Sequence, residues 1–524
     1  MDWFEKPILR DLLAQRLPKL DAGSLIQMEK ISLVATLTKP PSSRGDELVA
    51  LSDTVEWLEV RADLTGDLQP EWLRSHFRGN LLYTLRSREE GGRFEGSSEE
   101  RRRHFFQAAQ GYDLIDLEGG RDLDSDLKNC IPPERRLISW SGGSADFREL
   151  RERALEITAT PARLYRLSPA AKSASDGLAV LTALRLINRS DVIGFATGQA
   201  GLWSRLLAPH FGARFVFGVA GSRRDWLVEP TIWQLIEDYG LPSLPHLGAL
   251  YGIVGSNVSR SLSPRLHNAA YRALGFPGFF VPFLEDSFCD FWCNIVQSEQ
   301  LEVLQASLKG LTVASPHKDT ALDSAASISS MVQRAGSTNI FIRNGNGWKA
   351  DTTDPQGAVV ALVQRGVEIR RERVAVIGCG GAGRAVAAAL DLEGADVTLV
   401  NRSLDRGRRA EDLLGLPFIP LAEFSADNYS TLVNATPVGR NGDSLPFDVI
   451  RMQTGGIVID LTYGSEVTPL IARAQSAGLR TVDGLEVLLI QVLHQFRLMT
   501  DLEMPMELAR ERLGLRAVEL AALG

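Results

Sequence analysis

A glycine-rich turn between a strand and a helix is the clearest candidate for chemistry in this sequence. The run Gly378–Gly383 follows the apolar strand expected over Arg373–Ile377 and opens the alanine-rich helix expected over Arg384–Leu392. Glycine is needed where the backbone takes a positive φ or must approach a pyrophosphate closely. The N-terminus of a helix supplies free N–H groups and a favourable dipole for that anion. The pattern therefore predicts a dinucleotide site. Its predicted cofactor-binding residues are Gly378, Gly380, Gly381 and Ala382.

The residues after the next strand indicate which dinucleotide binds. The strand expected over Asp396–Val400 is followed by Asn401, Arg402 and Ser403, with Arg406 one helical turn later. An NAD site normally has an acidic residue here, which accepts a hydrogen bond from the ribose 2′-hydroxyl. A carboxylate would repel a 2′-phosphate, whereas the Arg402 guanidinium can bind it through two hydrogen bonds. The sign of the charge predicts NADP, with all four residues as cofactor contacts.

Polar residues that could bind and protonate a small substrate lie before this turn. Ser261 and Ser263 precede Pro264 at the start of an expected helix, where two hydroxyls suit an anion. Reduction of a ketone needs a proton at the carbonyl oxygen, and a lysine near a carboxylate can supply it. Lys318 and Asp354 have the required types, although two such residues far apart in a sequence carry no signal by themselves.

The order and spacing of these motifs resemble the shikimate dehydrogenase family over roughly residues 250–510. The resemblance implies an NADP-dependent oxidoreductase that reduces 3-dehydroshikimate to shikimate in chorismate and aromatic amino-acid biosynthesis. It also implies an α/β substrate-binding domain and a Rossmann NADP-binding domain. The motifs that carry the resemblance are Ser259–Pro264, Gly310–Lys318, Asp351–Gly357, Gly378–Gly383, Asn434–Gly439, and Gly484 with Gln491.

The resemblance assigns roles to single residues. Ser261 and Ser263 would hold the substrate carboxylate, while Lys318 and Asp354 would be the catalytic pair. Which of the two carries the proton stays open. The remaining assigned residues are Asn339, Gln491, Tyr463 and Thr312 for the substrate, and Thr436 and Gly484 for the cofactor.

Three positions depart from the family pattern. Ala314 stands where the family usually has a threonine that donates to the substrate, and Thr352 and Ile340 replace a frequent asparagine and threonine. Loss of one such contact costs roughly 1 kcal/mol, or about tenfold in binding, if nothing compensates. We expect the chemistry to survive with lower affinity or a shifted preference among shikimate-like acids.

The first half of the chain repeats short apolar segments separated by helix-length stretches. Such alternation predicts parallel βα units, and eight of them in about 215 residues predict a (β/α)8 TIM barrel, so the whole chain is α/β. The segment Tyr239–His246, with two prolines and a glycine, is typical of a linker. The eight expected strands are Ile31–Leu37, Val55–Arg61, Asn80–Ser87, Tyr112–Glu118, Arg136–Ser141, Ala162–Ser168, Asp191–Thr197 and Ala213–Val219.

This half resembles the type I 3-dehydroquinate dehydratase family over roughly residues 30–240. The matching residues lie at the C-terminal ends of strands, where a barrel places its active site. Fusion of such a barrel to a shikimate dehydrogenase is a known arrangement, so the two resemblances support each other. The resemblance implies polar and carboxylate contacts around a ligand from Glu59, Arg61, Arg86 and Arg205.

Two residues on which that family's reaction depends are missing. The family has a histidine after the fifth strand and a Schiff-base lysine on the sixth. Here the fifth strand continues as Ser139–Gly143, and the sixth, Ala162–Ser168, holds arginines and no lysine. Arginine stays protonated and cannot replace the lysine, and Lys172 is expected on the following helix. The loop Asp225–Pro230 also departs from the family. We therefore expect a catalytically degenerate barrel that could stabilise the dehydrogenase, mediate dimerisation or bind a ligand. Residual activity through an unrecognised lysine is the alternative.

Composition limits the remaining functions. With 44% hydrophobic and 23% charged residues and a net charge of −8, the chain is typical of a globular protein without a nucleic-acid surface. The run Arg101–Arg103 is interpreted as a solvated helix face, and the spacing of Cys289 and Cys293 as a core or half-exposed helix position rather than a metal site. The N-terminus lacks the uninterrupted apolar region of a signal peptide or membrane span. We expect a cytoplasmic monomer or homodimer whose partner is a small-molecule substrate, without nucleic acid, membrane or metal.

The length predicts several domains. The expected ones are a leader (1–29), the barrel (30–240), a substrate-binding domain (247–355), a Rossmann domain (356–485) and C-terminal helices that return to the substrate domain (486–524).

Three alternatives remain open at this stage. A fully bifunctional dehydratase/dehydrogenase would need activity in the barrel. A quinate/shikimate dehydrogenase would accept quinate and favour NAD, and Arg402 argues against that preference. A sensor that binds NADP and a shikimate-like acid without turnover would not need Lys318 and Asp354, and both are present.

Overall fold

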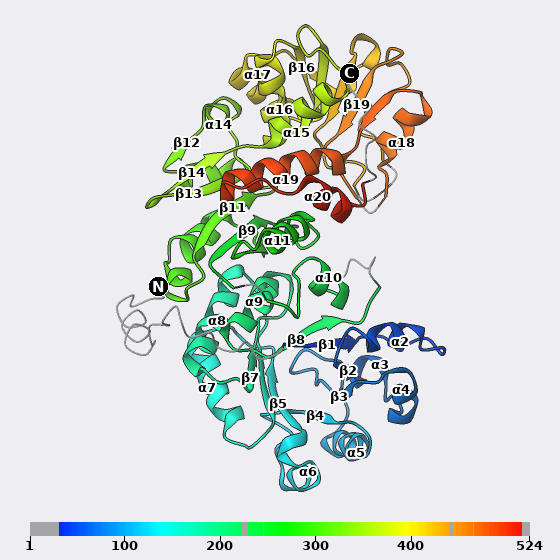
Figure 1. The fold of residues 1–524 in the computed structure, drawn as a ribbon, viewed down its shortest axis with the longest axis vertical. Helices are drawn as coiled ribbons and strands as arrows, with labels where there is room; N and C mark the ends of the chain where they lie inside the picture. The colour runs from blue at the N-terminus through cyan, green and yellow to red at the C-terminus, as the bar shows by residue number, and fades with distance from the viewer. Residues whose placement is uncertain are drawn as a thin grey trace. The chain divides into compact units, whose positions relative to one another are not determined.

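A computed structural model of the chain describes residues 31–222, 229–244, 246–440, 442, 444–464 and 466–515 (Figure 1). The expected leader and most of the loop Asp225–Pro230 lie outside the described residues. The chain divides into two compact units. The first consists of Met1–Leu250, Asn257–Pro264 and Phe276–Ser307, and the second of Tyr251–Ser256, Arg265–Gly275 and Leu308–Gly524.

The first unit contains the predicted barrel. Its eight strands are all parallel and lie in the order β7-β6-β5-β4-β3-β2-β1-β8. Strands β7 and β8 are therefore the two edge strands of a nearly closed barrel. Each lies within one of the eight expected segments, which confirms the (β/α)8 prediction. The strands are β1 (Ser32–Leu37), β2 (Trp57–Arg61), β3 (Asn80–Thr84), β4 (Leu114–Glu118), β5 (Arg136–Ser141), β6 (Leu164–Ser168), β7 (Val192–Gly194) and β8 (Phe215–Val219).

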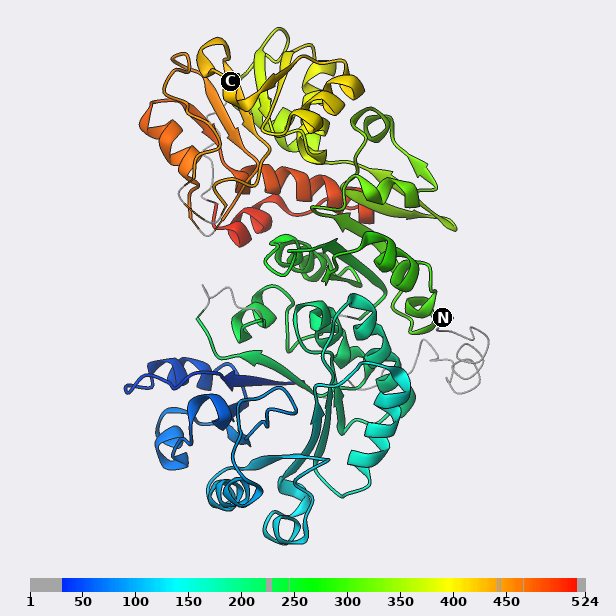
Figure 2. The ribbon, with the colours of Figure 1, turned by 180° about the vertical axis from the view of Figure 1, so that it is seen from behind.

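Helices lie outside the ring of strands (Figures 1 and 2). Several begin at side chains that accept hydrogen bonds from the first backbone N–H groups, as Asp124 and Asp146 do. These two caps help to fix where α6 and α7 start. The helices are α2 (Asp46–Ser52), α3 (Ala62–Thr65), α4 (Pro70–His76), α5 (Ser98–Ala108), α6 (Ser125–Cys130), α7 (Phe147–Thr158), α8 (Ala174–Ile187), α9 (Leu202–Leu207) and α10 (Ile232–Glu237).

The first unit also contains a later part of the chain. Strand β10 (Gly278–Leu284) is followed by α12 (Phe288–Phe291), a short π-helix at Trp292–Val296 and α13 (Gln300–Val303). Cys289 and Cys293 are exposed on this stretch, so the expected core or half-exposed position is wrong. The aromatic side chains beside them are the ones that pack inward.

The second unit begins with part of a mixed sheet in which β9, β11, β13, β14 and β12 are neighbours in that order. Strands β11 and β13 and strands β13 and β14 are antiparallel, whereas β12 and β14 are parallel. The strands are β9 (Ala249–Gly255), β11 (Leu308–Val313), β12 (Ser327–Ile328), β13 (Ile340–Asn344) and β14 (Gly347–Asp351), and the helices are α11 (Ser263–Leu274), α14 (Ser330–Ala335) and α15 (Asp354–Gln364).

A second sheet in this unit is entirely parallel and has the order β17-β16-β15-β18-β19-β20. This is the doubly wound 3-2-1-4-5-6 order, which opens a crevice where the chain reverses direction, beyond the C-terminal ends of its first and fourth strands. The strands are β15 (Arg373–Ile377), β16 (Asp396–Asn401), β17 (Phe418–Pro420), β18 (Thr431–Asn434), β19 (Ile457–Asp460) and β20 (Arg480–Val482), and the helices are α16 (Gly381–Leu392), α17 (Leu404–Leu414), α18 (Pro469–Ser476), α19 (Gly484–Thr500) and α20 (Met506–Leu513).

Candidate functional site

Lys318 and Asp354 form an ion pair in the second unit. The Lys318 Nζ donates to Asp354 Oδ2 at 2.6 Å. Lys318 lies in the turn after β11, and Asp354 is the first residue of α15, where the helix dipole stabilises a carboxylate. The Asp354 side chain is 3% exposed, whereas that of Lys318 is 19% exposed. The folded chain therefore offers an ammonium group at an accessible surface, held in place by a buried carboxylate.

Two amide side chains hold the other oxygen of this carboxylate. Asn339 Nδ2 donates to Asp354 Oδ1 at 3.0 Å, and Gln491 Nε2 donates to the same atom at 3.1 Å. Gln491 comes from α19, which approaches α15 closely because Gly357 has no side chain. A Cβ on Gly357 would lie 2.7 Å from Val487 Cγ1. The structure thus brings together four of the residues that the sequence singles out.

A hydrogen-bonded chain behind this cluster includes a residue that sequence reasoning missed. Thr312 Oγ1 donates to Gln495 Oε1 at 3.2 Å, and Gln495 Nε2 donates to Thr353 Oγ1 at 3.1 Å. Gln495 lies four residues after Gln491 on α19, so both project from the same side of the helix. That spacing was the available signal. The hydrogen of the Thr312 hydroxyl is engaged by the protein itself.

Thr352, beside this chain, is a buried residue whose hydroxyl has no hydrogen-bond partner within the described part of the protein. Ala314, which lacks a hydroxyl, follows β11 and is half-buried. A buried hydroxyl without a partner is costly and marks a position where a ligand oxygen can bind.

The remaining predicted substrate residues are Ser261, Ser263 and Tyr463. Ser261 and Ser263 fall in the segment Asn257–Pro264, which belongs to the first unit, and Ser263 N donates to Ser261 Oγ at 3.2 Å. Tyr463 is half-buried, and the Arg440 guanidinium lies 5.5 Å from the centre of its ring.

The glycine turn has the geometry that its residue types require. Gly378 has a φ of +111°, and a Cβ there would lie 2.9 Å from the Ala435 carbonyl. A Cβ on Gly383 would lie only 1.8 Å from Gly378 O, so the first turn of α16 must have glycine at this position to lie this close to the end of β15. In contrast, nothing lies within 4 Å of a Cβ built on Gly380. That open space, beside the free N–H groups of the first helical turn, fits a pyrophosphate.

The same turn contacts the catalytic candidate. A Cβ on Gly381 would lie 3.0 Å from both Lys318 Cβ and Ser337 Cβ, and Ser337 Oγ donates to Gly381 O at 2.9 Å. Ala382 follows as the second residue of α16. A dinucleotide seated on this turn would therefore lie next to the Lys318 side chain.

Asn401 and Arg402 differ in what they contact. Asn401 Oδ1 accepts from Cys379 N at 3.2 Å, which ties the glycine turn to the end of β16. Arg402, Ser403 and Arg406 are exposed, and Ser403 caps α17 by accepting from Arg406 N. Within the described residues, neither arginine forms an ion pair with a carboxylate. Both positive charges are therefore available to an anion.

The loop after β18 is held by a buried carboxylate. Asn434 Nδ2 donates to Asp460 Oδ1 at 2.9 Å, and Asn434 Oδ1 accepts from Thr436 Oγ1 at 2.7 Å. Thr462 Oγ1 donates to Thr436 O at 2.7 Å. A Cβ on Gly484 would lie 2.3 Å from Thr462 O, so only glycine lets α19 start this close to the loop. These contacts place Thr436 at the crevice of the parallel sheet.

The barrel holds an arginine inside, where the resemblance led us to look for a lysine. Arg166, on β6, is 5% exposed, and its guanidinium donates to Glu59 Oε1 at 3.0 Å and to Asp116 Oδ2. Thr36 and Thr84 donate to the two oxygens of Glu59. Burial alone would raise the pKa of Glu59, but the Arg166 and Arg61 guanidinium groups lower it to about 2. Arg166 is therefore fixed as a cation between two carboxylates.

The other predicted barrel residues are also bound by protein groups. Arg61 pairs with Asp63 through two hydrogen bonds of 2.8 Å, and Arg205 pairs with Glu229. Arg86 donates to Asp116 Oδ2 at 2.5 Å. Its other terminal nitrogen donates to Ser139 Oγ on β5 at 2.9 Å and to Glu90 Oε2 at 2.7 Å. Burial, followed by the neighbouring carboxylates Glu118 and Asp116, outweighs Arg86 and raises the pKa of Glu90 to about 7.

Two expectations about the barrel are wrong. Arg101 is 2% exposed and makes two hydrogen bonds of 2.7 Å to Asp122, so it is not part of a solvated face. Its partner comes from the turn after β4, across the gap between neighbouring βα units. Lys172 lies before α8, which starts at Ala174, rather than on that helix.

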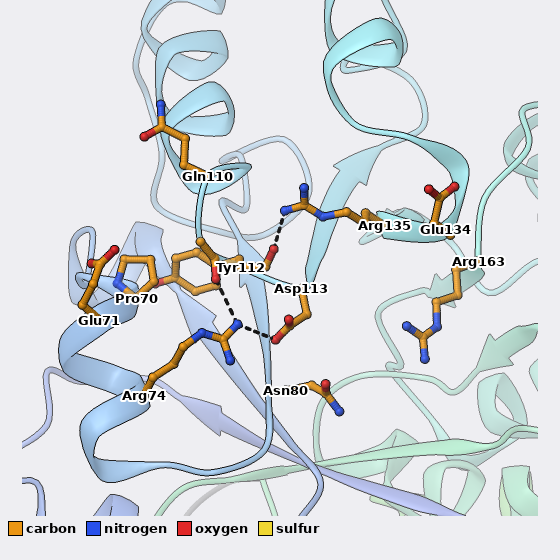
Figure 3. A pocket seen from close by; sticks show the side chains of 11 residues that line it. Pro70, Glu71, Arg74, Asn80, Gln110, Tyr112, Asp113, Glu134, Arg135 and Arg163 are labelled. Carbon is orange, nitrogen blue, oxygen red and sulfur yellow. Dashed lines mark hydrogen bonds and ion pairs between the residues drawn. The ribbon is translucent and has the colours of Figure 1, made fainter.

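A polar groove of about 700 Å³ lies at the other end of the barrel strands (Figure 3). It is lined by residues at or just before the starts of β3 to β6, among them Asn80, Asp113, Arg135 and Arg163. Arg74 pairs with Asp113 at 2.9 Å, and Arg135 donates to Tyr112 O at 2.5 Å. Barrel enzymes react at the C-terminal ends of their strands. The groove lies at the N-terminal ends of the strands, so we do not assign it to an active site.

Among the described residues, no group of three or more histidine, cysteine or carboxylate side chains is arranged to hold a metal ion. No helix in the described ranges has both the length and the apolar character needed to cross a membrane.

A doubly wound sheet whose glycine turn abuts a lysine–aspartate pair defines the class of dinucleotide-dependent oxidoreductases. The type I 3-dehydroquinase family model matches residues 34–235, and the shikimate dehydrogenase substrate-binding domain model matches residues 253–341. A shikimate dehydrogenase (NADP(+)) of Syntrophobacter fumaroxidans is 32% identical over 250 residues, which cover 46% of this chain and 84% of the relative. The chain belongs to the shikimate dehydrogenase family.

Two further comparisons extend over both halves, and a third covers one half. The bifunctional 3-dehydroquinate dehydratase/shikimate dehydrogenase, chloroplastic, of Arabidopsis thaliana is 27% identical over 503 residues, covering 89% of this chain and 80% of the relative. The dehydroquinate dehydratase and shikimate dehydrogenase of S. pombe AroM covers 93% of this chain and 99% of its own, with 23% identity and a TM-score of 0.41. The Thermus thermophilus shikimate 5-dehydrogenase in complex with NADP(H) and shikimate covers 51% and 98%, with 28% identity and a TM-score of 0.45.

Proposed function

We propose that the chain is an NADP-dependent shikimate dehydrogenase that reduces 3-dehydroshikimate to shikimate in the shikimate pathway. The observation that carries this proposal is the Lys318–Asp354 pair, 2.6 Å apart, packed against Gly381 of the dinucleotide turn. The family of the relatives supports the same substrate and cofactor. The named relatives include a chloroplastic protein, and we propose the cytoplasm for this chain from its sequence alone.

Each residue of the cluster has a part in this reaction. A bound NADP cofactor supplies hydride transfer. Lys318, whose ammonium is accessible, donates a hydrogen bond to the substrate ketone oxygen and passes a proton to it. Asp354 keeps the ammonium in place, and Asn339 and Gln491 fix Asp354. Both amides stay our candidates for the substrate hydroxyls, although Asn339 already exchanges hydrogen bonds with Thr353. Ser261 and Ser263 bind the carboxylate, and Tyr463 and Thr312 complete the substrate surface.

The cofactor residues follow from the crevice. Gly378, Gly380, Gly381 and Ala382 hold the pyrophosphate, and Arg402 and Arg406 hold the 2′-phosphate with Ser403. Asn401 shapes the turn through its hydrogen bond to Cys379 N, and Thr436 and Gly484 form the nicotinamide side. We also propose the boundaries 247–355 and 356–485 for the substrate-binding and NADP-binding domains.

We further propose that the barrel is catalytically degenerate. Arg166, bound between Glu59 and Asp116, supplies no neutral amine for a Schiff base, and β5 offers Ser139 without a histidine. Among the described residues, the candidates Glu59, Arg61, Arg86 and Arg205 are each engaged by protein partners. They remain as a vestigial ligand site.

An assay of the purified chain with each substrate separately tests both proposals. We expect NADPH-dependent reduction of 3-dehydroshikimate, little turnover of quinate with NAD, and no dehydration of 3-dehydroquinate. Borohydride added with 3-dehydroquinate should label no lysine. Turnover of 3-dehydroquinate at the rate of an ordinary dehydratase would contradict the degenerate barrel, and binding of NADPH without reduction would favour a sensor.

Arg402→Asp should reverse the cofactor preference. The change removes a charge-assisted pair of hydrogen bonds and adds a repulsive charge, which together weaken NADPH about 100-fold while leaving NADH unchanged or better. Steady-state kinetics with the two cofactors measure this ratio. Arg409→Asp, another exposed arginine on α17, is the matched control and should change neither value. If Arg402→Asp still favours NADPH, the 2′-phosphate assignment is wrong.

A further inference from the structure

The outer face of the barrel formed by α8 and α9 is covered by a later part of the chain. Trp203, on α9, is fully buried, and its ring centre lies 5.1 Å from that of Phe283 on β10. The indole Nε1 donates to Ala174 O at 3.0 Å, which fixes the ring between the two helices. Gly177 makes room for it, since a Cβ there would lie 2.7 Å from Nε1. This face is shaped around an aromatic contact with a strand that follows the barrel in the sequence.

The contact continues into a larger aromatic cluster. Phe283 packs on Phe291 with ring centres 5.2 Å apart, and Phe288 stacks on Trp292 at 5.6 Å. All four of these side chains are less than 5% exposed. Burying an aromatic ring removes a large apolar area from water. Without the barrel, Phe283 would therefore lose the side chain that covers it.

Phe279, at the start of the same strand, contacts a second part of the barrel. Its ring centre lies 5.6 Å from His210 and 6.3 Å from Tyr239. Tyr239 belongs to the segment that the sequence indicates as a linker, and it is 5% exposed. The first residue of this segment is thus packed against β10.

A buried carboxylate adds a polar contact at the edge of this surface. Glu285, directly after β10, is 8% exposed, and its Oε2 accepts from Ala174 N at 3.1 Å. Ala174 is the first residue of α8, whose N-terminus favours a negative charge. The α8 helix is therefore completed by a side chain from outside the barrel.

We propose that the α8–α9 face of the barrel is a scaffold for the reductase half of the chain. It holds β10 in its folded position, and through the compact unit that they share it positions the segment Asn257–Pro264. The positioning of this segment rests on the proposed function, in which its residues Ser261 and Ser263 bind the substrate carboxylate. Trp203 and Glu285 are positioning residues in this scheme, and a barrel without catalysis retains a task.

The test compares full-length variants by hydrogen exchange and by kinetics. Trp203→Leu should accelerate exchange of the backbone amides in Gly278–Leu284 and Asn257–Pro264 by about tenfold or more, because local opening becomes easier. Exchange in the parallel sheet around Arg373–Ile377 should not change. The KM for 3-dehydroshikimate should rise on the order of tenfold, while the KM for NADPH stays constant. Phe283→Leu should act in the same direction and serves if Trp203→Leu does not fold.

The control is Phe105→Leu, a fully buried aromatic residue on α5 of the same barrel that packs on Tyr83. It should change neither the exchange of β10 nor the KM for the acid. The scaffold is ruled out if β10 exchanges at the native rate in the Trp203 and Phe283 variants, or if Phe105→Leu accelerates it equally. If β10 exchanges faster but the KM for 3-dehydroshikimate does not change, the claim that the barrel positions Ser261 and Ser263 is wrong. If the unaltered chain does not reduce the acid, the proposed function fails, and exchange alone still decides the scaffold.

Discussion

Lys318→Met is expected to lower kcat for 3-dehydroshikimate reduction by about 10²- to 10⁴-fold, the contribution of a positioned proton donor. Methionine keeps the Cβ that packs on Gly381 and a stem of similar length, so the dinucleotide turn should stay intact. The Kd of NADPH, measured by fluorescence titration, should therefore change little. Loss of turnover with retained cofactor binding would locate the defect in the chemical step.

The control is Lys309→Met, which replaces an exposed lysine on β11, nine residues before Lys318. It should leave kcat unchanged. A Lys318→Met variant that keeps more than about a tenth of kcat would remove Lys318 from the mechanism, because general acid–base groups contribute more than that. A parallel pH profile of Asp354→Asn would then identify the proton carrier.

Arg166→Met should destabilise the barrel by about 3–5 kcal/mol, because it leaves Glu59 and Asp116 buried without their shared cation. Urea unfolding, followed by the fluorescence of the barrel tryptophans, measures the free energy. Arg78→Met is the matched control, since Arg78 pairs with Asp53 at 3.9 Å on the exposed surface. Such a pair contributes about 0–1 kcal/mol.

A second variant separates the lost charge from the lost side-chain volume. Glu59→Gln combined with Arg166→Met removes the carboxylate that loses its ion pair, whereas Asp116 keeps its ion pair with Arg86. The double variant should therefore recover part of the stability. If Arg166→Met costs less than about 1 kcal/mol, the buried pairs are weaker than their geometry indicates. The interpretation of Arg166 as a fixed structural cation would then be wrong.

Periodicity was sufficient to predict the barrel, but it was not sufficient to predict the contacts within it. The eight strands are short apolar segments at regular intervals, and each lies within its expected range. The sequence shows an arginine, Arg166, on the sixth expected strand, but it does not show what this arginine contacts. Its partners Glu59 and Asp116 are 107 and 50 residues away, and only the closing of the ring brings them together.

Arg101 shows why a local pattern can mislead. Three consecutive arginines suggest a solvated helix face, yet successive helical residues point about 100° apart, so one of three can point inward. Which one does so depends on Asp122, which follows a different strand. The Lys318–Asp354 pair has the same character, because nothing in the spacing of two residues 36 positions apart indicates a contact.

Family resemblance provided the roles that spacing could not. It led to Lys318, Asp354, Asn339 and Gln491, which the structure places in one hydrogen-bonded cluster. It did not lead to Gln495, whose helical spacing from Gln491 was visible in the sequence. Resemblance identifies residues with an assigned role, and it overlooks those that only support them.

The contact between Trp203 and Phe283 has a consequence for how such a chain evolves. A barrel that has lost its reaction would ordinarily be free to accumulate mutations or to be deleted. Here, deletion would expose the aromatic core of the neighbouring strand, and a split gene would produce two chains that must find each other before either aggregates. Natural selection on the reductase would then preserve the fold of the barrel even if its active site, as we propose, is no longer used.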